Sequence, residues 1–234
     1  MTISRSSVFA GALLLSVALT GRSALADRSV DRTFAPANVS KLVIHVDSGD
    51  VRFVAAGDKS PVHLHVTLRG TIPDPQIESV RSGKQLTITI ESPHGAVLPF
   101  GSRGSVAYEF AYPSSMALEV YDQGGDLSAD GSRAAVAMET GSGSIELTNA
   151  HGPVDVLADS GDVRVDLASD WHASSVRLQS GAGDLHLRTP VNLHAHVVVN
   201  SGAGKVDNAL TNSNASGTFV FLYTKAGDIS IAPL

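Results

Sequence analysis

Five aspartates occupy the same place in a short motif that recurs along the chain, and carboxylates spaced in this way could bind a cation. Each directly follows a glycine and precedes an apolar residue: Asp50, Asp126, Asp162, Asp184 and Asp228. If the repeats stack, these oxygens form a row that would suit Ca²⁺ in a weak structural site. The other interpretation is that each carboxylate accepts hydrogen bonds from the backbone of its own turn. Ser144 and Lys205 take the same place in two further repeats, so the row is interrupted and we expect no metal.

Two His-x-His pairs, His63/His65 and His194/His196, are the next candidates for metal binding. Alternate residues of a strand share a face, so both members of each pair could reach one ion. Apolar residues alternate with the first pair, which makes its histidines the solvent-facing side of a half-buried strand. The chain has no cysteine and no His-Glu-x-x-His motif to complete a zinc site. We therefore predict no metal site at either pair.

No motif assigns a catalytic or cofactor-binding residue. The nucleophile elbow Gly-x-Ser-x-Gly is absent from the sequence, and Gly141-Ser142-Gly143 lacks the lysine and the helix that a phosphate-binding loop needs. Glycosidases use paired carboxylates, and several aspartates gather between residues 155 and 166. These aspartates coincide with corner, loop and solvent-facing positions of the repeat. We therefore keep a carbohydrate-active β-helix enzyme, either a lyase or a hydrolase, only as the alternative function.

Trp171 is the only tryptophan of the chain and lies in an insertion that lengthens its repeat to 22 residues. A tryptophan at the tip of a loop is a candidate for contact with a partner. The alternative is that it folds back over the edge of the repeat.

The spacing of the motif predicts the elements that carry these residues. From Leu127 onward, the apolar residues after each glycine corner are separated by 18, 18, 22, 21 and 23 residues. A near-constant period of this size indicates stacked repeats that bury a continuous core. Within a repeat, apolar and polar residues alternate on both sides of the glycine, as in 154–157 and 163–165. This alternation is typical of strands with one buried face.

These features predict an all-β, single-chain β-solenoid of roughly seven to ten coils, with a glycine at the corner of each coil. The alternative is a β-sandwich, which also has short strands and frequent turns but does not require the same corner residues in every repeat. Glu146 and Arg164 fall on adjacent coils and should lie side by side. Residues 61–121 are less regular and read as decorated coils of the same domain, or as a separate small β domain.

Residues 1–26 fit a secretory signal peptide. Arg5 precedes an apolar run, 8–19, that is shorter than the ~20 residues a spanning helix needs, and Ala24-Leu25-Ala26 fits a cleavage site. The expected mature domain is 27–234, located in the periplasm or secreted, with no later transmembrane segment. Removal of Arg5 and Arg22 changes the formal charge from −6 to −8. Because the basic residues form no cluster, the sequence argues against nucleic acid and anionic lipid as partners.

The corners Ser48-Gly49-Asp50-Val51, Ser160-Gly161-Asp162-Val163 and Ser180-Gly181-Ala182-Gly183-Asp184 resemble those of a bacterial family of exported β-strand-repeat proteins. The family is called putative adhesins and carries a domain of unknown function. The resemblance covers residues 38–234 and implies a β-solenoid without established enzymatic activity and without catalytic residues to transfer. Fold alone does not give function.

We therefore expect an exported, non-enzymatic scaffold or adhesin-like binding module at the cell envelope, whose partner is an unidentified protein or envelope component. Solenoids expose strand edges at uncapped ends. The last corner, 225–228, is followed by a single short strand with Pro233, so the C-terminal coil is expected to be an open edge. Such an edge could support an end-to-end homodimer.

Overall fold

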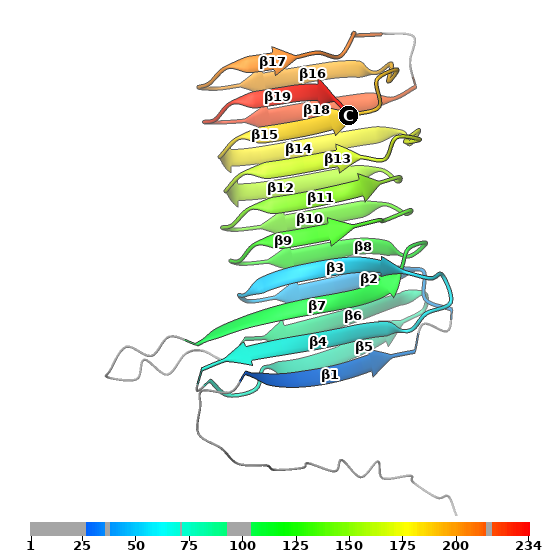
Figure 1. The fold of residues 1–234 in the computed structure, drawn as a ribbon, viewed down its shortest axis with the longest axis vertical. Helices are drawn as coiled ribbons and strands as arrows, with labels where there is room; N and C mark the ends of the chain where they lie inside the picture. The colour runs from blue at the N-terminus through cyan, green and yellow to red at the C-terminus, as the bar shows by residue number, and fades with distance from the viewer. Residues whose placement is uncertain (1–26, 36–37, 71, 93–103, 214–216) are drawn as a thin grey trace, which may run out of the picture.

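The structure is a computed structural model that describes residues 27–35, 38–70, 72–92, 104–213 and 217–234 (Figure 1). The signal peptide expected at residues 1–26 lies outside the described residues. All regular elements within the described ranges are β-strands. Across those ranges, no helix has the length and apolarity that a membrane crossing requires.

The strands form two sheets. In spatial order, sheet A contains β1 (Arg28–Phe34), β4 (Val62–Arg69), β7 (Ser105–Pro113), β3 (Asp50–Ala56), β9 (Leu127–Asp130), β11 (Ile145–Ala150), β13 (Val163–Leu167), β15 (Leu185–Thr189), β19 (Ile229–Pro233) and β17 (Val206–Asn208). Sheet B contains β16 (His196–Ser201), β18 (Phe219–Thr224), β14 (Ser175–Ala182), β12 (Val154–Ser160), β10 (Val136–Thr140), β8 (Ala117–Asp122), β2 (Lys41–Val46), β6 (Gln85–Glu91) and β5 (Gln76–Ser82).

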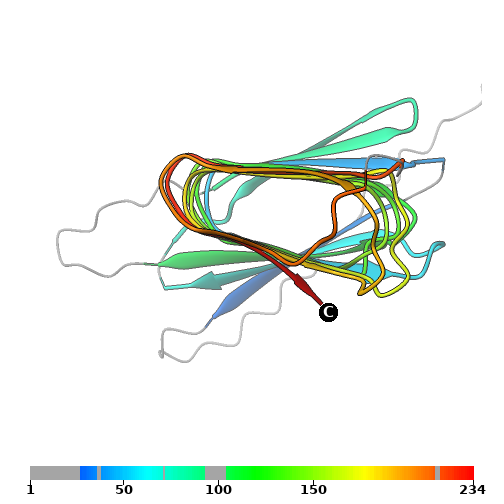
Figure 2. The same cartoon turned by 90° about the horizontal axis from the view of Figure 1, so that it is seen from above.

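One strand of sheet B, a corner and one strand of sheet A make a coil. The eight coils of the described chain are β2–β3, β6–β7, β8–β9, β10–β11, β12–β13, β14–β15, β16–β17 and β18–β19. Neighbouring coils pair in parallel, for example β10 with β12 and β13 with β15. Viewed from above, most coils superimpose as one flattened ring (Figure 2). The predicted β-solenoid is confirmed, and the alternative β-sandwich is not adopted.

The core fills the narrow space between the two sheets. Alternation turns every second side chain inward, so Val163 and Val165 of β13 and Val156 of β12 are each 0% exposed. At the N-terminal end the core is aromatic, with the rings of Phe53 and Phe110 stacked at 5.1 Å. Burial of these apolar side chains is the main favourable contribution to folding.

Residues 61–121 extend the same two sheets. β4 lies antiparallel between β1 and β7, and β5 forms an antiparallel hairpin with β6. β6 and β7 also lie within this region and continue sheets B and A beside β2 and β3, and residues 93–103 between them lie outside the described residues. Figure 2 shows the strands of this end diverging from the outline of the later coils.

The coils do not stack in chain order at either end of the solenoid. β2–β3 lies between β6–β7 and β8–β9, and β18–β19 lies between β14–β15 and β16–β17. The expectation that the C-terminal coil is the open end is therefore wrong. β19 is paired on both sides, with β15 and β17, so Pro233 does not terminate an edge. The coil at the end of the stack is β16–β17.

Each corner requires glycine because the coils approach one another there at backbone distance. Gly143 has φ of +124°, a conformation that side-chain-bearing residues avoid. A Cβ at Gly143 would lie 2.1 Å from the carbonyl oxygen of Gly125, the equivalent residue of the neighbouring coil. The same contact recurs from Gly161 to Gly143 and from Gly183 to Gly161, at 2.0 and 2.1 Å. The predicted glycine corners are confirmed, and the structure shows that they combine positive φ with close backbone approach.

A column of buried hydroxyl groups satisfies the corner carbonyls. Ser180 Oγ donates to Gly161 O at 3.1 Å and Thr224 Oγ1 donates to Gly183 O at 3.0 Å, each reaching from one coil to the next. Asp122 takes this place in β8 and is only 5% exposed. Its Oδ1 accepts a hydrogen bond from Gly124 N at 3.2 Å, whereas Oδ2 has no partner among the described residues. Burial, reinforced by the nearby carboxylates of Asp50 and Asp47, raises the pKa of Asp122 to about 6.

Replacing a corner glycine should be strongly destabilising. We predict that Gly143→Ala loses about 3 kcal/mol or more of unfolding free energy, because the added Cβ meets a backbone oxygen and the residue must keep positive φ. Denaturant unfolding followed by circular dichroism measures the loss. Gly57→Ala is the matched control, since its Cβ would meet nothing nearer than Ser60 Oγ at 3.5 Å. Equal stability of the two variants would contradict the close stacking of the corners.

Asp122 should make the protein less stable as the pH rises. A carboxyl whose folded pKa of about 6 exceeds its unfolded value binds more protons when folded, so stability falls between about pH 4 and pH 6 and is flat above. If the folded state binds this proton a hundredfold more tightly than the unfolded state, the unfolding free energy falls by about 3 kcal/mol across this pH range. Asp122→Thr introduces the hydroxyl that Thr140 and Thr224 already supply in this column, and should remove this fall. Unfolding free energies of both proteins at pH 4.5 and pH 7.5 test this, and parallel pH profiles would contradict it.

Candidate functional site

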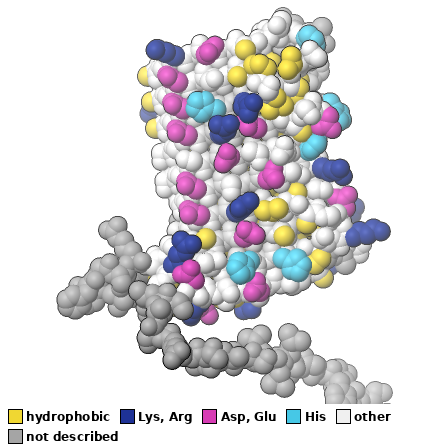
Figure 3. Space-filling view, in the orientation of Figure 1, with side chains coloured by type: hydrophobic (Ala, Val, Ile, Leu, Met, Phe, Trp, Pro, Cys, Tyr) yellow, Lys and Arg dark blue, Asp and Glu magenta, His cyan; other side chains and the backbone are white. Residues whose placement is uncertain are grey.

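The five predicted aspartates do form one row along the solenoid. In spatial order the row is Asp50, Asp126, Ser144, Asp162, Asp184, Asp228 and Lys205, at the corner that leads into sheet A. Figure 3 shows it as a column of acidic side chains along the left edge of this face, with a break partway. Asp228 comes before Lys205 in space, against their order in the sequence, because coil β18–β19 lies between β14–β15 and β16–β17.

Each carboxylate of the row is used by the backbone of the neighbouring coil. Asp162 Oδ1 accepts a hydrogen bond from Asp184 N at 2.9 Å, and Asp184 Oδ1 accepts one from Asp228 N at 2.7 Å. The same bond runs from Ser144 N to Asp126 and from Lys205 N to Asp228. The expectation that each aspartate binds its own turn is therefore corrected: the acceptor serves the next coil. Among the described residues no group of three or more potential ligands could hold a metal ion.

Both histidines of the first His-x-His pair contact side chains of the edge strand β1. His65 Nδ1 lies 2.7 Å from Asp31 Oδ1, and His63 Nδ1 lies 3.0 Å from Thr33 Oγ1. In the second pair, the His196 ring stacks on Phe219 with ring centroids 5.7 Å apart. The predicted neighbours Glu146 and Arg164 are confirmed, with Arg164 Nε 3.9 Å from Glu146 Oε1.

Trp171 lies in the core and not at the surface. Only 4% of its surface is exposed, and its Nε1 donates a hydrogen bond to Gly152 O at 2.9 Å. A contact with a partner requires exposed area, which Trp171 does not have. The partner-contact hypothesis is therefore corrected in favour of the alternative, in which the indole folds back over the edge of its coil.

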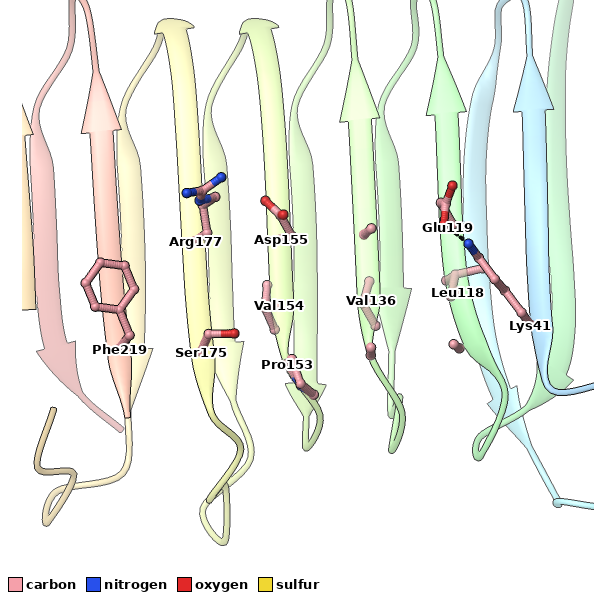
Figure 4. A pocket seen from close by; sticks show the side chains of 13 residues that line it. Lys41, Leu118, Glu119, Val136, Pro153, Val154, Asp155, Ser175, Arg177 and Phe219 are labelled. Atoms are coloured by element: carbon pink, nitrogen blue, oxygen red, sulfur yellow. Dashed lines mark ion pairs between the residues drawn. The ribbon is translucent and has the colours of Figure 1, made fainter. Parts of the chain in front are cut away.

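The outer face of sheet B contains a trough that the sequence did not reveal. Outward positions near the starts of β8, β10 and β12 carry the small residues Ala117, Ala135, Ala137 and Pro153, so the surface is low there. Larger side chains rise at both sides, Lys41 and Glu119 at one and Arg177 and Phe219 at the other (Figure 4). The hollow has a volume of about 590 Å³. A second hollow of about 280 Å³ adjoins it through shared residues, Glu119, Ala137, Asp155 and Arg177.

The Lys41 wall of the trough is fixed by polar contacts. Lys41 Nζ forms an ion pair with Glu119 Oε2, and Tyr121 OH donates to Glu119 Oε1 at 2.6 Å. The hydrogen bonds from Lys41 and Tyr121 lower the pKa of Glu119, and the bond to Glu119 raises the pKa of Tyr121 to about 12. The His45 ring stacks on Tyr121 at 4.9 Å. This wall is therefore preorganised, with its charges already paired.

The opposite wall is aromatic. The Phe219 ring lies nearly parallel to the rings of His196 and Phe221, with centroids 5.7 and 6.4 Å away, and the Arg177 guanidinium carbon lies 5.4 Å from the Phe221 ring centroid. Asp155 and Arg177 are paired in register on adjacent strands, yet within the described chain neither is joined to an opposite charge by an ion pair. This pair of charges remains available to a ligand that lies in the trough.

Sequence reasoning missed the trough because it depends on neighbours in space. The one available signal was the run of outward aromatics Phe219, Phe221 and Tyr223 in the last strand-like stretch. Nothing in the sequence places that stretch beside β14, which is separated from it by a whole repeat.

The Asp row should act through hydrogen bonds and without a metal. We predict that Asp162→Ala loses about 1–2 kcal/mol of unfolding free energy, because Asp184 N loses its charged acceptor. Asp162→Asn keeps an acceptor oxygen and should lose less. Thermal unfolding of all three proteins, each with added Ca²⁺ and with a chelator, measures both effects. A large Ca²⁺-dependent rise in the wild-type midpoint would show a metal ladder instead.

Several solved bacterial proteins are similar in structure to this chain. A putative cell adhesion protein from Clostridium sporogenes has 12% identity and a TM-score of 0.54, with coverage of 89% of this chain and 100% of that one. A putative adhesin from Bacteroides fragilis has 11% identity and a TM-score of 0.44, with 88% and 97% covered. A putative lipid binding protein from Parabacteroides distasonis has 14% identity and a TM-score of 0.35, with 89% and 96% covered.

At these identities the likeness of the Clostridium protein supports the fold alone. No curated protein matches the chain. The sequence profile of the family Toastrack DUF4097 matches residues 39–231, which span both sheets, the glycine corners, the Asp row and the trough. The match covers more than half of the chain, and we conclude that the protein belongs to the Toastrack DUF4097 family.

Proposed function

We propose that the protein is a non-enzymatic binding module of the bacterial cell envelope, exported by its N-terminal segment, that holds an extended polypeptide along the trough of sheet B. The observation that carries this proposal is the trough itself. It crosses the parallel strands β8, β10, β12 and β14, has a floor of small apolar residues, and lies within the 300–1,000 Å³ range typical of ligand sites.

An extended polypeptide fits the chemistry of this surface better than a sugar chain. Sugars are recognised largely through hydrogen bonds to their hydroxyl groups, and the small residues of the floor, Ala117, Ala135, Ala137 and Pro153, present only apolar side chains. The floor offers apolar contact for side chains that alternate along an extended chain. Asp155 and Arg177 offer one charge of each sign on adjacent strands, so a suitable peptide carries apolar residues flanked by a basic and an acidic group.

The charges of the trough support a binding role over catalysis. A glycosidase needs one carboxyl with a raised pKa as its general acid, and the pKa of Glu119 is lowered by Lys41 and Tyr121. The name of the Clostridium relative, a putative cell adhesion protein, agrees with a binding module. The signal-peptide pattern of residues 1–26 supports a periplasmic or secreted location.

Filling the trough should remove peptide binding. Peptides enriched on the purified protein from a random phage-displayed library serve as the probe, and their affinities are measured by isothermal calorimetry. Ala137→Arg places a long side chain on the floor and should weaken binding at least tenfold, about 1.4 kcal/mol. Ala111→Arg, a comparable outward alanine of β7 in sheet A, is the control and should bind as the wild type does.

Two results would contradict the proposal. Peptides that bind both variants equally, or a library from which none is enriched, would exclude the trough as a polypeptide site. Release of reducing ends from envelope polysaccharides by the wild-type protein would establish the carbohydrate-active alternative.

A further inference from the structure

We propose that two copies of the protein associate end to end through the outer edge of coil β16–β17, with β17 pairing antiparallel to β17 of the second copy about Val206. This inference does not use the trough, which is lined by residues of β2, β8, β10, β12, β14 and β18. The inference rests on the unpaired backbone groups, the exposed core position and the charges of this coil, which lies at one end of the stack (Figure 1).

The outer edge of β17 carries unused hydrogen-bonding groups. N–H and C=O groups of successive residues in a strand alternate between its two edges. Lys205 O accepts from Ile229 N at 2.8 Å and Ala209 N donates to Ile231 O at 3.0 Å, so the odd-numbered residues face β19. Val206 and Asn208 therefore turn their backbone groups outward, where the described chain places no further strand. Such an edge is a template for another strand.

The start of β16 is covered by the protein itself. His196 N donates to Thr218 O at 2.8 Å, so in β16 the odd-numbered residues face outward. Ala195 O accepts from Ser213 N at 2.8 Å, and Val197 N donates to Asn212 Oδ1 at 3.3 Å. Val199 lies beyond this cover, so the open part of the edge runs from Val199 around the corner to β17.

The core is also left open at this end. Val206 is in register with Ile229, and Ile229 is 1% exposed whereas Val206 is 49% exposed. Within the described residues, Val206 is the only inward apolar residue of its column that remains exposed to this degree. An exposed core position beside free backbone groups is a surface that gains both hydrogen bonds and apolar burial on docking.

The charges beside Val206 identify the occupant as a second copy. Antiparallel pairing about Val206 places Lys205 of each copy directly opposite Asp207 of the other, on the outer face. Because Val206 has outward backbone groups, the Lys205–Asp207 positions form non-hydrogen-bonded pairs, in which side chains come closest. Two opposite-charge pairs then stabilise the interface. A twofold axis along the sheet normal also brings the open part of β16 beside its counterpart.

A head-to-tail filament does not fit the two ends. The N-terminal end closes with β1 and β5, each antiparallel to its neighbour, and its strands diverge from the ring outlined by the other coils (Figure 2). The N-terminal end therefore offers no edge that matches β16–β17. The contact joins two β16–β17 ends and gives a closed dimer.

Charge reversal at β17 tests the pairing. Sedimentation equilibrium of the purified protein over a range of concentrations should show a monomer–dimer equilibrium. Lys205→Asp and Asp207→Lys should each weaken the dimer about tenfold or more, since each brings like charges together. The double variant K205D/D207K restores opposite charges and should regain most of the affinity. Circular dichroism and thermal midpoints confirm that the variants are folded.

An apolar variant gives a second test. Val206→Lys should dissociate the dimer, whereas Val80→Lys, at a 65% exposed valine of β5 at the opposite end, should leave it unchanged. A strict monomer at every concentration, a double variant as weak as the single ones, dissociation by Val80→Lys, or open-ended larger species would each overturn the proposal.

Discussion

The close approach of coil backbones at the glycine corner is the constraint on which the other features depend. At Gly143, Gly161 and Gly183 the missing Cβ makes room for the carbonyl oxygen of the coil beside it. Only at this separation can Asp162 reach the amide of Asp184, and Ser180 the carbonyl of Gly161. The corner is thus held by three interactions that all cross between coils, and no coil forms it alone.

This construction explains why the motif repeats without forming a reactive site. The carboxylates of the row are committed to backbone amides, and the hydroxyls inside the corner are committed to carbonyls. Asp122 is the exception, because a carboxylate cannot donate to a carbonyl as Thr140 and Thr224 can. Its raised pKa follows from that mismatch and from burial. The outer face of sheet B, where side chains vary from coil to coil, offers a surface for recognition.

Much of the fold could be predicted from local sequence, because one corner motif and one alternation pattern specify each coil. The adjacency of Glu146 and Arg164 followed directly from the repeat period. The position of β18–β19 did not follow from the sequence, because the later coils present similar inward Val, Leu and Ile residues that encode no preferred neighbour. The hydrogen-bond donor to each aspartate could not be predicted either, because the sequence does not distinguish an amide of the next coil from an amide of the same turn. The trough required knowledge of which outward residues adjoin across strands.

Stacking out of chain order underlies both proposals, since it places Phe219 beside the trough and leaves Val206 at the open end. The chain has no cysteine, so engineered pairs give an unambiguous test. His186 of β15 is in register with Ser230 of β19, at a strand spacing that permits a disulfide. We predict that His186→Cys/Ser230→Cys forms an intramolecular disulfide under mild oxidation, whereas His186→Cys/Asp207→Cys, two strands apart, does not. Efficient bridging of residues 186 and 207, without bridging of 186 and 230, would show coils stacked in chain order and would contradict this arrangement.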